Sequence, residues 1–165
     1  YAVSGFQTCA LPISIINNVL FGPNFHGGFD GLGKRDYAIK YLEKVGLADE
    51  LHGRLDEPAH KLSGGQQQRL CLARTLANQP RVILMDEPCA SLDPVATRRI
   101  ERLITAMKAD YTIIVVTHNM AQARRISDEA IFMVDGRVVE AGGTEQLFKN
   151  PKTGLMDEFA RDQMG

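Results

Sequence analysis

The middle of the chain combines unbroken apolar runs with a segment of helical periodicity. Residues 82–85 and 112–116 are continuous apolar runs, the pattern of strands buried on both faces of a parallel sheet. Between them, apolar residues recur every three or four positions from 96 to 107, after the helix-start pair Asp93 and Pro94. We therefore predict a strand–helix–strand unit with parallel strands and a right-handed connection, in an α/β fold.

The segment before this unit is predicted to be a small helical region. Residues 24–34 are rich in glycine and predict a loop. Residues 35–45 carry apolar side chains at helical spacing, and Gly46 is a typical helix stop. Ser63 followed by Gln66 is a capping-box pattern at the start of a further amphipathic helix.

The segment after this unit predicts shorter elements. A short helix is expected at residues 120–126. Apolar residues on both sides of Asp135 and Gly136 predict a hairpin over residues 131–139 with a two-residue turn. The C-terminal tail, residues 144–165, is expected to form short helices.

Composition and charge narrow the function classes. The 165 residues are 44% hydrophobic and 24% charged, with a net charge of −1, so no basic surface for nucleic acid or membrane is indicated. No apolar run approaches the roughly 20 residues that cross a bilayer, so a membrane link is expected to go through a partner protein. Three widely spaced cysteines suit a reducing, cytoplasmic setting.

Two carboxylates follow the first apolar run. Asp86 and Glu87 come directly after residues 82–85, at the carboxyl end of a strand, where open α/β sheets bind ligands. An apolar strand ending in Asp is the Walker B pattern, in which the carboxylate holds Mg²⁺, usually through water. Glu87 would then orient and deprotonate a water beside a γ-phosphate. For an isolated Asp-Glu pair, capping of a turn before Pro88 would be the simpler interpretation.

The start of the helix after Leu62 predicts a phosphate receptor. Gly64 and Gly65 allow close approach of a ligand to the backbone, and a helix start offers unpaired N–H groups and a positive dipole end. Ser63 adds a hydroxyl group. Taken alone, Ser63–Gln66 is equally compatible with a capping box that has no ligand.

His118 lies at the end of the second apolar run, beside Thr117. A single histidine at a strand end is usually a hydrogen-bonded structural residue. Here the neighbouring strand ends in Asp86 and Glu87, and the carboxyl ends of parallel strands meet at one edge of the sheet. His118 is therefore predicted to contact the γ-phosphate together with Glu87.

In this order and spacing, these elements resemble the ABC ATPase family. The resemblance implies the C-terminal part of a P-loop NTPase domain, with a parallel sheet, flanking helices and a helical subdomain, that uses ATP and Mg²⁺. It implies that Asp86 holds Mg²⁺, that Glu87 is the general base and that His118 is the switch histidine. It also implies a signature that reaches the nucleotide of the opposite subunit, made of Ser63, Gly64, Gly65 and Gln66, and a dimer-contacting D-loop, made of Ser91, Leu92 and Asp93.

Residues 28–34 fit the G-x-x-x-x-G-K spacing of a phosphate-binding loop. Arg35 stands where that motif needs Ser or Thr, and residues 21–24 are a turn sequence in place of a strand. The segment also lies too close to the signature to be the family's Walker A. We therefore predict that this chain contains no Walker A and has no ATPase activity alone.

Four segments, residues 66–74, 86–89, 111–120 and 147–152, narrow the resemblance within the family. In these segments the chain resembles the ATP-binding subunit of phosphate importers. This implies a homodimer with a second ATPase subunit, two transmembrane permease subunits, an indirect periplasmic phosphate-binding protein and no nucleic acid. It also implies a peripheral location on the cytoplasmic face of the bacterial inner membrane. The alternatives are a polar amino acid importer and, less favoured, a non-transport ABC ATPase.

The expected organisation begins with a segment that is not native. Residues 7–13 resemble the translation of a sequencing adaptor, so residues 1–13 are predicted not to belong to the natural protein. Gln7 is for this reason a weak candidate for the family's Q-loop glutamine. The remaining residues, 14–165, form a partial ABC ATPase domain: a helical and signature subdomain at about 14–75, core strands and helices at about 80–143 and C-terminal helices at 144–165.

Overall fold

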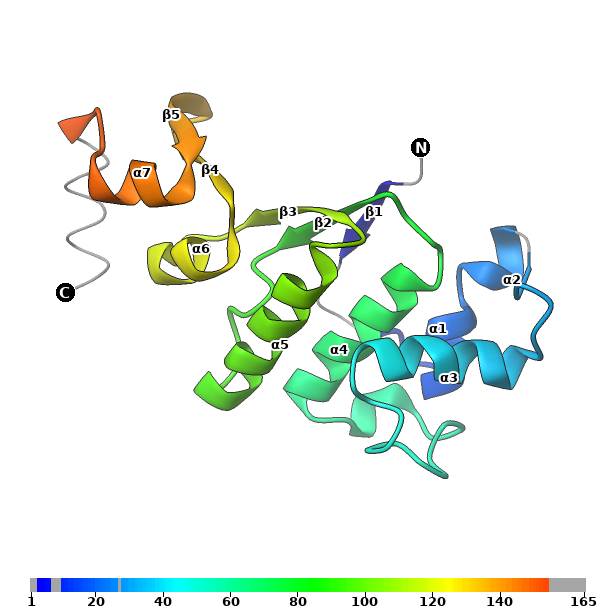
Figure 1. Ribbon diagram of the computed structural model, residues 1–165. Coiled ribbons are helices and arrows are strands. Elements are labelled where there is room, and N and C mark those ends of the chain that lie inside the picture. Colours follow the sequence, from blue (N-terminus) through cyan, green and yellow to red (C-terminus); the bar gives the residue numbers. More distant parts are fainter. Residues whose placement is uncertain (1–2, 7–9, 27, 155–165) are drawn as a thin grey trace. The chain divides into compact units, whose positions relative to one another are not determined.

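The computed structural model describes residues 3–6, 10–26 and 28–154 (Figure 1). The chain divides into two compact units, residues 1–116 and 117–165. Each unit is described separately below.

A parallel sheet lies in the first unit. Strands β1 (Val3–Phe6), β2 (Val82–Asp86) and β3 (Thr112–Val116) are hydrogen-bonded in the order β1-β2-β3, and both pairings are parallel. Helix α5 (Pro94–Met107) connects β2 to β3. The predicted strand–helix–strand unit with parallel strands is therefore confirmed.

The rest of the first unit is helical. Two of its helices are joined by a buried hydrogen bond. The hydroxyl of Tyr37, on the helix Lys34–Lys44, donates to the carbonyl of Ala77, the C-cap of the helix Gly64–Leu76 (2.7 Å). Leu42 on the first of these helices and Leu70 and Leu72 on the second are buried. The elements are α1 (Ile15–Leu20), α2 (Pro23–His26), α3 (Lys34–Lys44), the 3₁₀ turn η1 (Ala59–Lys61) and α4 (Gly64–Leu76).

The loop predicted at residues 24–34 is partly helical, because α2 occupies Pro23–His26. Proline suits the first position of a helix, where its missing N–H would have no intrahelical partner. The helix predicted at residues 35–45 is confirmed as α3, and Gly46 beyond it has a φ of 65°, which glycine adopts without strain.

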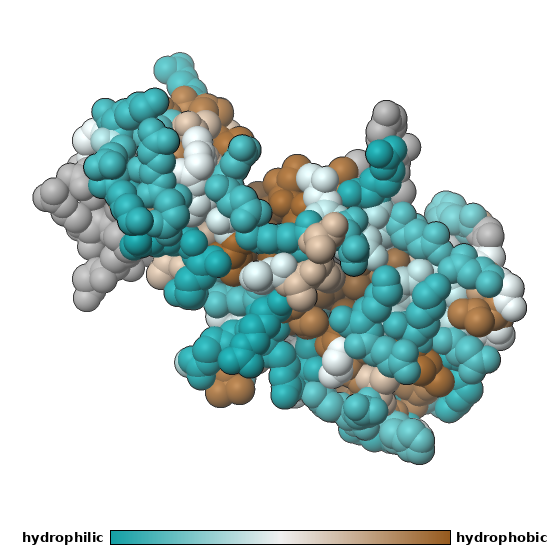
Figure 2. Space-filling view, in the orientation of Figure 1, coloured by the Kyte–Doolittle hydropathy of each residue, from teal (hydrophilic) through white to brown (hydrophobic). Residues whose placement is uncertain are grey.

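The expectation that both faces of the central strands are buried is wrong. Ile83 and Met85 are 0% and 2% exposed, whereas Leu84, Ile114 and Val116 are 37%, 51% and 60% exposed. Burial therefore alternates along each strand, since helices α4 and α5 lie on one side of the sheet (Figure 1). The described residues of this unit leave apolar surface over the sheet on the other side (Figure 2).

The second unit contains the predicted hairpin. Asp135 and Gly136 have φ angles of 48° and 73° and connect Val134 to its partner Arg137, as in a two-residue type I′ turn. Met120 and Leu147 form a small buried cluster in this unit. Its elements are α6 (Met120–Ile126), β4 (Glu129–Val134), β5 (Arg137–Gly143) and α7 (Thr144–Lys149).

The short helix predicted at residues 120–126 is thus confirmed, and the strands of the hairpin are longer than predicted. Across the described part of the chain, no helix has both the length and the apolar character needed to cross a membrane.

Candidate functional site

The predicted signature, Ser63–Gln66, forms the first turn of α4. Ser63 is the N-cap: its Oγ accepts a hydrogen bond from the N–H of Gln66 (3.3 Å), and its own N–H donates to Oε1 of Gln66 (3.1 Å). The capping box is confirmed. Helix geometry leaves the N–H groups of Gly64 and Gly65 without an intrahelical acceptor, at the positive end of the helix dipole. The turn can therefore receive an anion.

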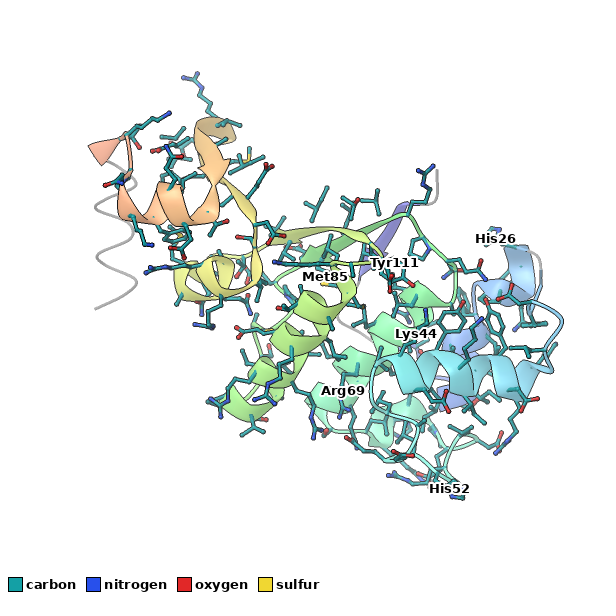
Figure 3. All side chains as sticks on the ribbon, viewed as in Figure 1. His26, Lys44, His52, Arg69, Met85 and Tyr111 are labelled. Carbon is teal, nitrogen blue, oxygen red and sulfur yellow. The ribbon has the colours of Figure 1, made fainter. Side chains whose placement is uncertain are left out.

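A carboxylate from outside α4 braces this turn. Glu50 accepts from Nε2 of Gln66 (3.1 Å) and from both terminal nitrogens of Arg69 (3.1 and 2.9 Å), and Arg99 on α5 pairs with it at 2.8 Å. Figure 3 labels Arg69 on α4. These partners hold the pKa of Glu50 below its ordinary value, with the Arg69 hydrogen bond as the largest cause, against an opposing effect of burial.

The predicted D-loop, Ser91–Asp93, ends at the start of α5. One carboxylate oxygen of Asp93 accepts from the N–H groups of Val95 (2.8 Å) and Ala96 (3.0 Å). These backbone donors lower the pKa of Asp93. The N-cap predicted from Asp93 and Pro94 is therefore confirmed.

The signature turn and the D-loop line one cavity of about 400 Å³. At its wall the two helices come very close, because a Cβ on Gly65 would lie 2.9 Å from the Cβ of Ala96. Gly65 is thus required for the approach of α4 to α5. The lining also includes Glu50, Arg69 and Arg99, together with Ser63, Gly64, Gln66, Ser91, Leu92, Asp93 and Val95.

A second link joins α4 to the segment after β2. Nε2 of Gln68, whose residue is buried, donates to the carbonyl of Pro88 (2.7 Å). The helix that begins at the signature turn is therefore connected directly to the segment that follows Asp86 and Glu87.

Asp86 and Glu87 lie at the carboxyl end of β2. Asp86 pairs with Val116, the last residue of β3, and the N–H of Glu87 donates to the carbonyl of Val116 (2.9 Å). Glu87 has a φ of 44°, which is unfavourable for a residue with a Cβ and is concentrated at functional sites. The side chain of Asp86 is exposed and that of Glu87 is half-buried.

His118 follows β3 by two residues and belongs to the second unit. The next residue, Asn119, caps helix α6. Its N–H donates to Oγ1 of Thr117 (3.1 Å), and its Oδ1 accepts from the N–H of Gln122 (2.8 Å). His118 is exposed. Its predicted cooperation with Glu87 stays a prediction.

Residues 28–34, which fit the G-x-x-x-x-G-K spacing of a phosphate-binding loop, do not have the flanking structure that this motif requires. Helix α2 precedes it, and Lys34 is the first residue of α3. The ammonium of Lys34 lies 5.5 Å from the ring centroid of Phe29, a cation–π contact. The motif's strand–loop–helix arrangement is therefore not met. Gln7 lies outside the described residues, and the prediction for residues 1–13 stays untested.

The carboxylate of Asp86 fits a Mg²⁺ site of the kind in which one or two carboxylates, water and substrate phosphates share the ligation. Its exposed position at the strand end leaves room for such ligands. Within the described residues, no group of three or more His, Cys, Asp and Glu side chains could hold a metal by itself. The residues present suit a metal that arrives with a nucleotide.

Glu50, Arg69 and Arg99 were not predicted from the sequence to belong to the site. Glu50 lies in the turn region between α3 and η1, 16 residues before Gln66 and 49 before Arg99. No local pattern marks such pairs, because the contacts depend on how α4 and α5 pack.

Comparison with known proteins gives one result for both sequence and fold. A family model described as "ABC transporter" matches residues 8–90, just over half of the chain. The chain is 47% identical over 154 residues to "Phosphate import ATP-binding protein PstB" of Ehrlichia ruminantium, strain Gardel, and equally to that of strain Welgevonden. The match covers 93% of this chain and 61% of those relatives, so the chain spans less than two thirds of their length.

Solved structures of ABC transporter proteins resemble the fold of this chain. CbiO1 of Clostridium perfringens, described as part of the ABC transporter complex cbiONQ, aligns with a TM-score of 0.75 and 26% identity, over 90% of this chain and 59% of the other. A bacterial Atm1-family ABC exporter with ATP bound aligns with a TM-score of 0.78 and 25% identity, over 99% of this chain and 29% of the other. The chain has the fold of an ABC ATPase and belongs to the ABC transporter family of ATP-binding proteins.

Proposed function

We propose that the protein containing this chain hydrolyses ATP to energise the import of inorganic phosphate. The choice of phosphate as the substrate rests on the 47% identity to two phosphate import ATP-binding proteins over nearly the whole chain. The ATPase assignment is supported by the placement of Asp86 and Glu87 at the carboxyl end of β2 and by the capped helix start at Ser63, which lines a cavity together with the D-loop.

In this proposal the strand ends carry the chemistry. Asp86 would hold Mg²⁺ through a bound water molecule. Glu87 orients a water molecule and takes its proton as that water attacks the γ-phosphate. His118 contacts the same phosphate. Mg²⁺, when bound, neutralises the charge of the phosphate groups.

The signature turn and the D-loop serve a second copy of the protein. Ser63, Gly64 and Gly65 direct a hydroxyl and two N–H groups at the γ-phosphate held by the other subunit, and Gln66 keeps the turn in shape. Asp93 and the D-loop contact that subunit. The homodimer works with two transmembrane permease subunits, as a peripheral protein on the cytoplasmic face of the inner membrane.

The test is transport by the complete protein. It is reconstituted with its two permease subunits in proteoliposomes that enclose ATP, with the phosphate-binding protein outside. We expect ATP-dependent uptake of labelled phosphate and none of glutamine or histidine. Glu87→Gln should abolish uptake, whereas Glu43→Gln, on an exposed position of α3, should not.

The two parts of the proposal fail separately. Uptake of a polar amino acid in place of phosphate would contradict the proposed substrate but not the ATPase assignment. ATP turnover that does not depend on Glu87 would overturn the ATPase assignment of the site.

A further inference from the structure

Two segments that are far apart in the sequence, the start of α4 and helix α5, meet at the carboxylate of Glu50. Gln66 belongs to the signature turn, Arg69 lies one helical turn further along α4, and Arg99 lies on α5, beyond the D-loop. All four residues line the same cavity. Glu50 is therefore the point at which the two predicted ligand-facing segments are connected by side chains.

The two arginines have different surroundings. The side chain of Arg69 is 5% exposed and also donates to the carbonyls of Gly46 (2.7 Å) and Gly65 (3.4 Å). A cation buried to this extent needs a counter-charge. The side chain of Arg99 is 57% exposed, so its pair with Glu50 contributes little to folding stability. The Glu50–Arg99 pair therefore restrains the geometry of the cavity wall more than it stabilises the fold.

We propose that Glu50 is a positioning residue that fixes the signature turn relative to the start of α5, so that both segments present one preformed surface to a second copy of the protein. This rests on the proposed function, in which that surface closes over the partner's ATP. Glu50 acts through Gln66 and Arg69 on one side and through Arg99 on the other.

The geometry explains why such a link is useful. At Gly65 the two helices are so close that an added Cβ would lie 2.9 Å from the Cβ of Ala96, and the Glu50–Arg99 pair adds a second restraint between α4 and α5 at another point of the cavity wall. Without the pair, the turn keeps its capping box but loses its fixed orientation toward the D-loop. Binding of a partner would then have to order the two segments, which weakens association.

The experiment uses the complete protein with Glu87→Gln, in which ATP should hold two copies together. Dimer formation is measured by analytical ultracentrifugation over a series of ATP and protein concentrations. Adding Arg99→Gln should weaken dimerisation by about tenfold, equivalent to about 1.4 kcal/mol, while Tm changes little. Arg54→Gln is the matched control, because it removes an ion pair to Glu57 (3.0 Å) that does not line the cavity.

A double-mutant cycle separates positioning from direct contact. If Arg99 acts through Glu50, Arg99→Gln has no further effect once Glu50→Gln is present, and Arg99→Lys recovers part of the dimerisation by keeping the cation. An equal effect of Arg99→Gln in both backgrounds would mean direct contact with the partner and would overturn the proposal, as would dimerisation unchanged by Arg99→Gln. If Glu87→Gln alone forms no ATP-dependent dimer, the proposed function fails instead.

Discussion

The signature turn and the end of β2 are held in different ways. At the signature turn, side chains form the restraints: the capping box of Ser63 and Gln66, and the carboxylate of Glu50 with its three partners. At the end of β2, a backbone bond takes part in the restraint: the N–H of Glu87 donates to the carbonyl of Val116, and the φ of Glu87 is 44°.

This difference suits two different tasks. A surface that must fit a phosphate and a partner benefits from side chains that are already ordered, because less freedom is lost on binding. The proposed general base and the proposed metal-binding carboxylate need side chains that remain available to ligands, and the exposed position of Asp86 suits this need. The two regions thus rely on different bonds, and the hydrogen bond from Gln68 to Pro88 connects them within one unit of the fold.

The largest expected effect separates chemistry from binding at the end of β2. In the complete protein, Glu87→Gln should lower kcat by at least about 100-fold, because an amide can orient water but cannot accept its proton. ATP affinity should be retained, and an ATP-bound dimer should accumulate. Steady-state ATPase assays and size-exclusion chromatography measure the two effects. Near-native turnover would show that Glu87 is not the base.

The second prediction concerns a substitution in the signature turn. Ser63→Arg, combined with Glu87→Gln, should abolish the ATP-dependent dimer, because a long cation would fill the cavity at the helix start and remove the capping hydroxyl. Chromatography with and without ATP provides the measurement. Ala109→Arg, an exposed position that does not line the cavity, is the control. A dimer that survives Ser63→Arg would refute the placement of Ser63 against the partner's nucleotide.

Local signals allowed much of both regions to be predicted. Ser63 with Gln66 and Asp93 with Pro94 marked the starts of α4 and α5, because a cap depends only on residues within one turn. The apolar run 82–85 placed the two carboxylates at a strand end, because a continuous apolar run is itself a local signal for a strand.

What could not be predicted depends on distant parts of the chain. The pairing of Glu50 with Arg99 is set by the packing of α4 against α5, and no pattern near either residue encodes it. Burial on both faces of β2 was inferred from its composition, yet Leu84 is 37% exposed, since burial is decided by what covers the sheet. The positive φ of Glu87 follows from the turn after β2 and carries no signature in residue type.

The third prediction tests how tightly the signature turn fits against α5. Gly65→Ala should lower the unfolding free energy of the complete protein by about 1–3 kcal/mol, because the new methyl group would lie 2.9 Å from Ala96 Cβ. Gly64→Ala is the matched control: its Cβ would meet Leu92 Cδ2 at 3.7 Å, an ordinary contact. Urea denaturation measures both. Equal stability of the two variants would show that α4 and α5 are not in close contact here.

The smallest expected effect concerns the charge of Glu50. Its pKa is lowered in the folded protein from an ordinary 4.5, chiefly by the hydrogen bond from Arg69. A lowered carboxyl pKa stabilises the fold fully above the ordinary value, and this contribution is lost as the pH falls from about 4.5 toward the folded pKa. The stability difference between the parent and Glu50→Gln should therefore be constant from pH 7 to pH 5 and shrink below pH 4.5.

Glu140 provides the comparison that isolates the signature turn. Its pKa is also lowered, chiefly by the N–H of Lys152, in the second unit. Urea denaturation at a series of pH values should show the same direction of change for Glu140→Gln, yet only Glu50→Gln should weaken the ATP-dependent dimer at neutral pH. A stability difference for Glu50→Gln that stays constant down to pH 3 would contradict the ion-pair network around Glu50, because a protonated carboxyl group no longer pairs with either arginine.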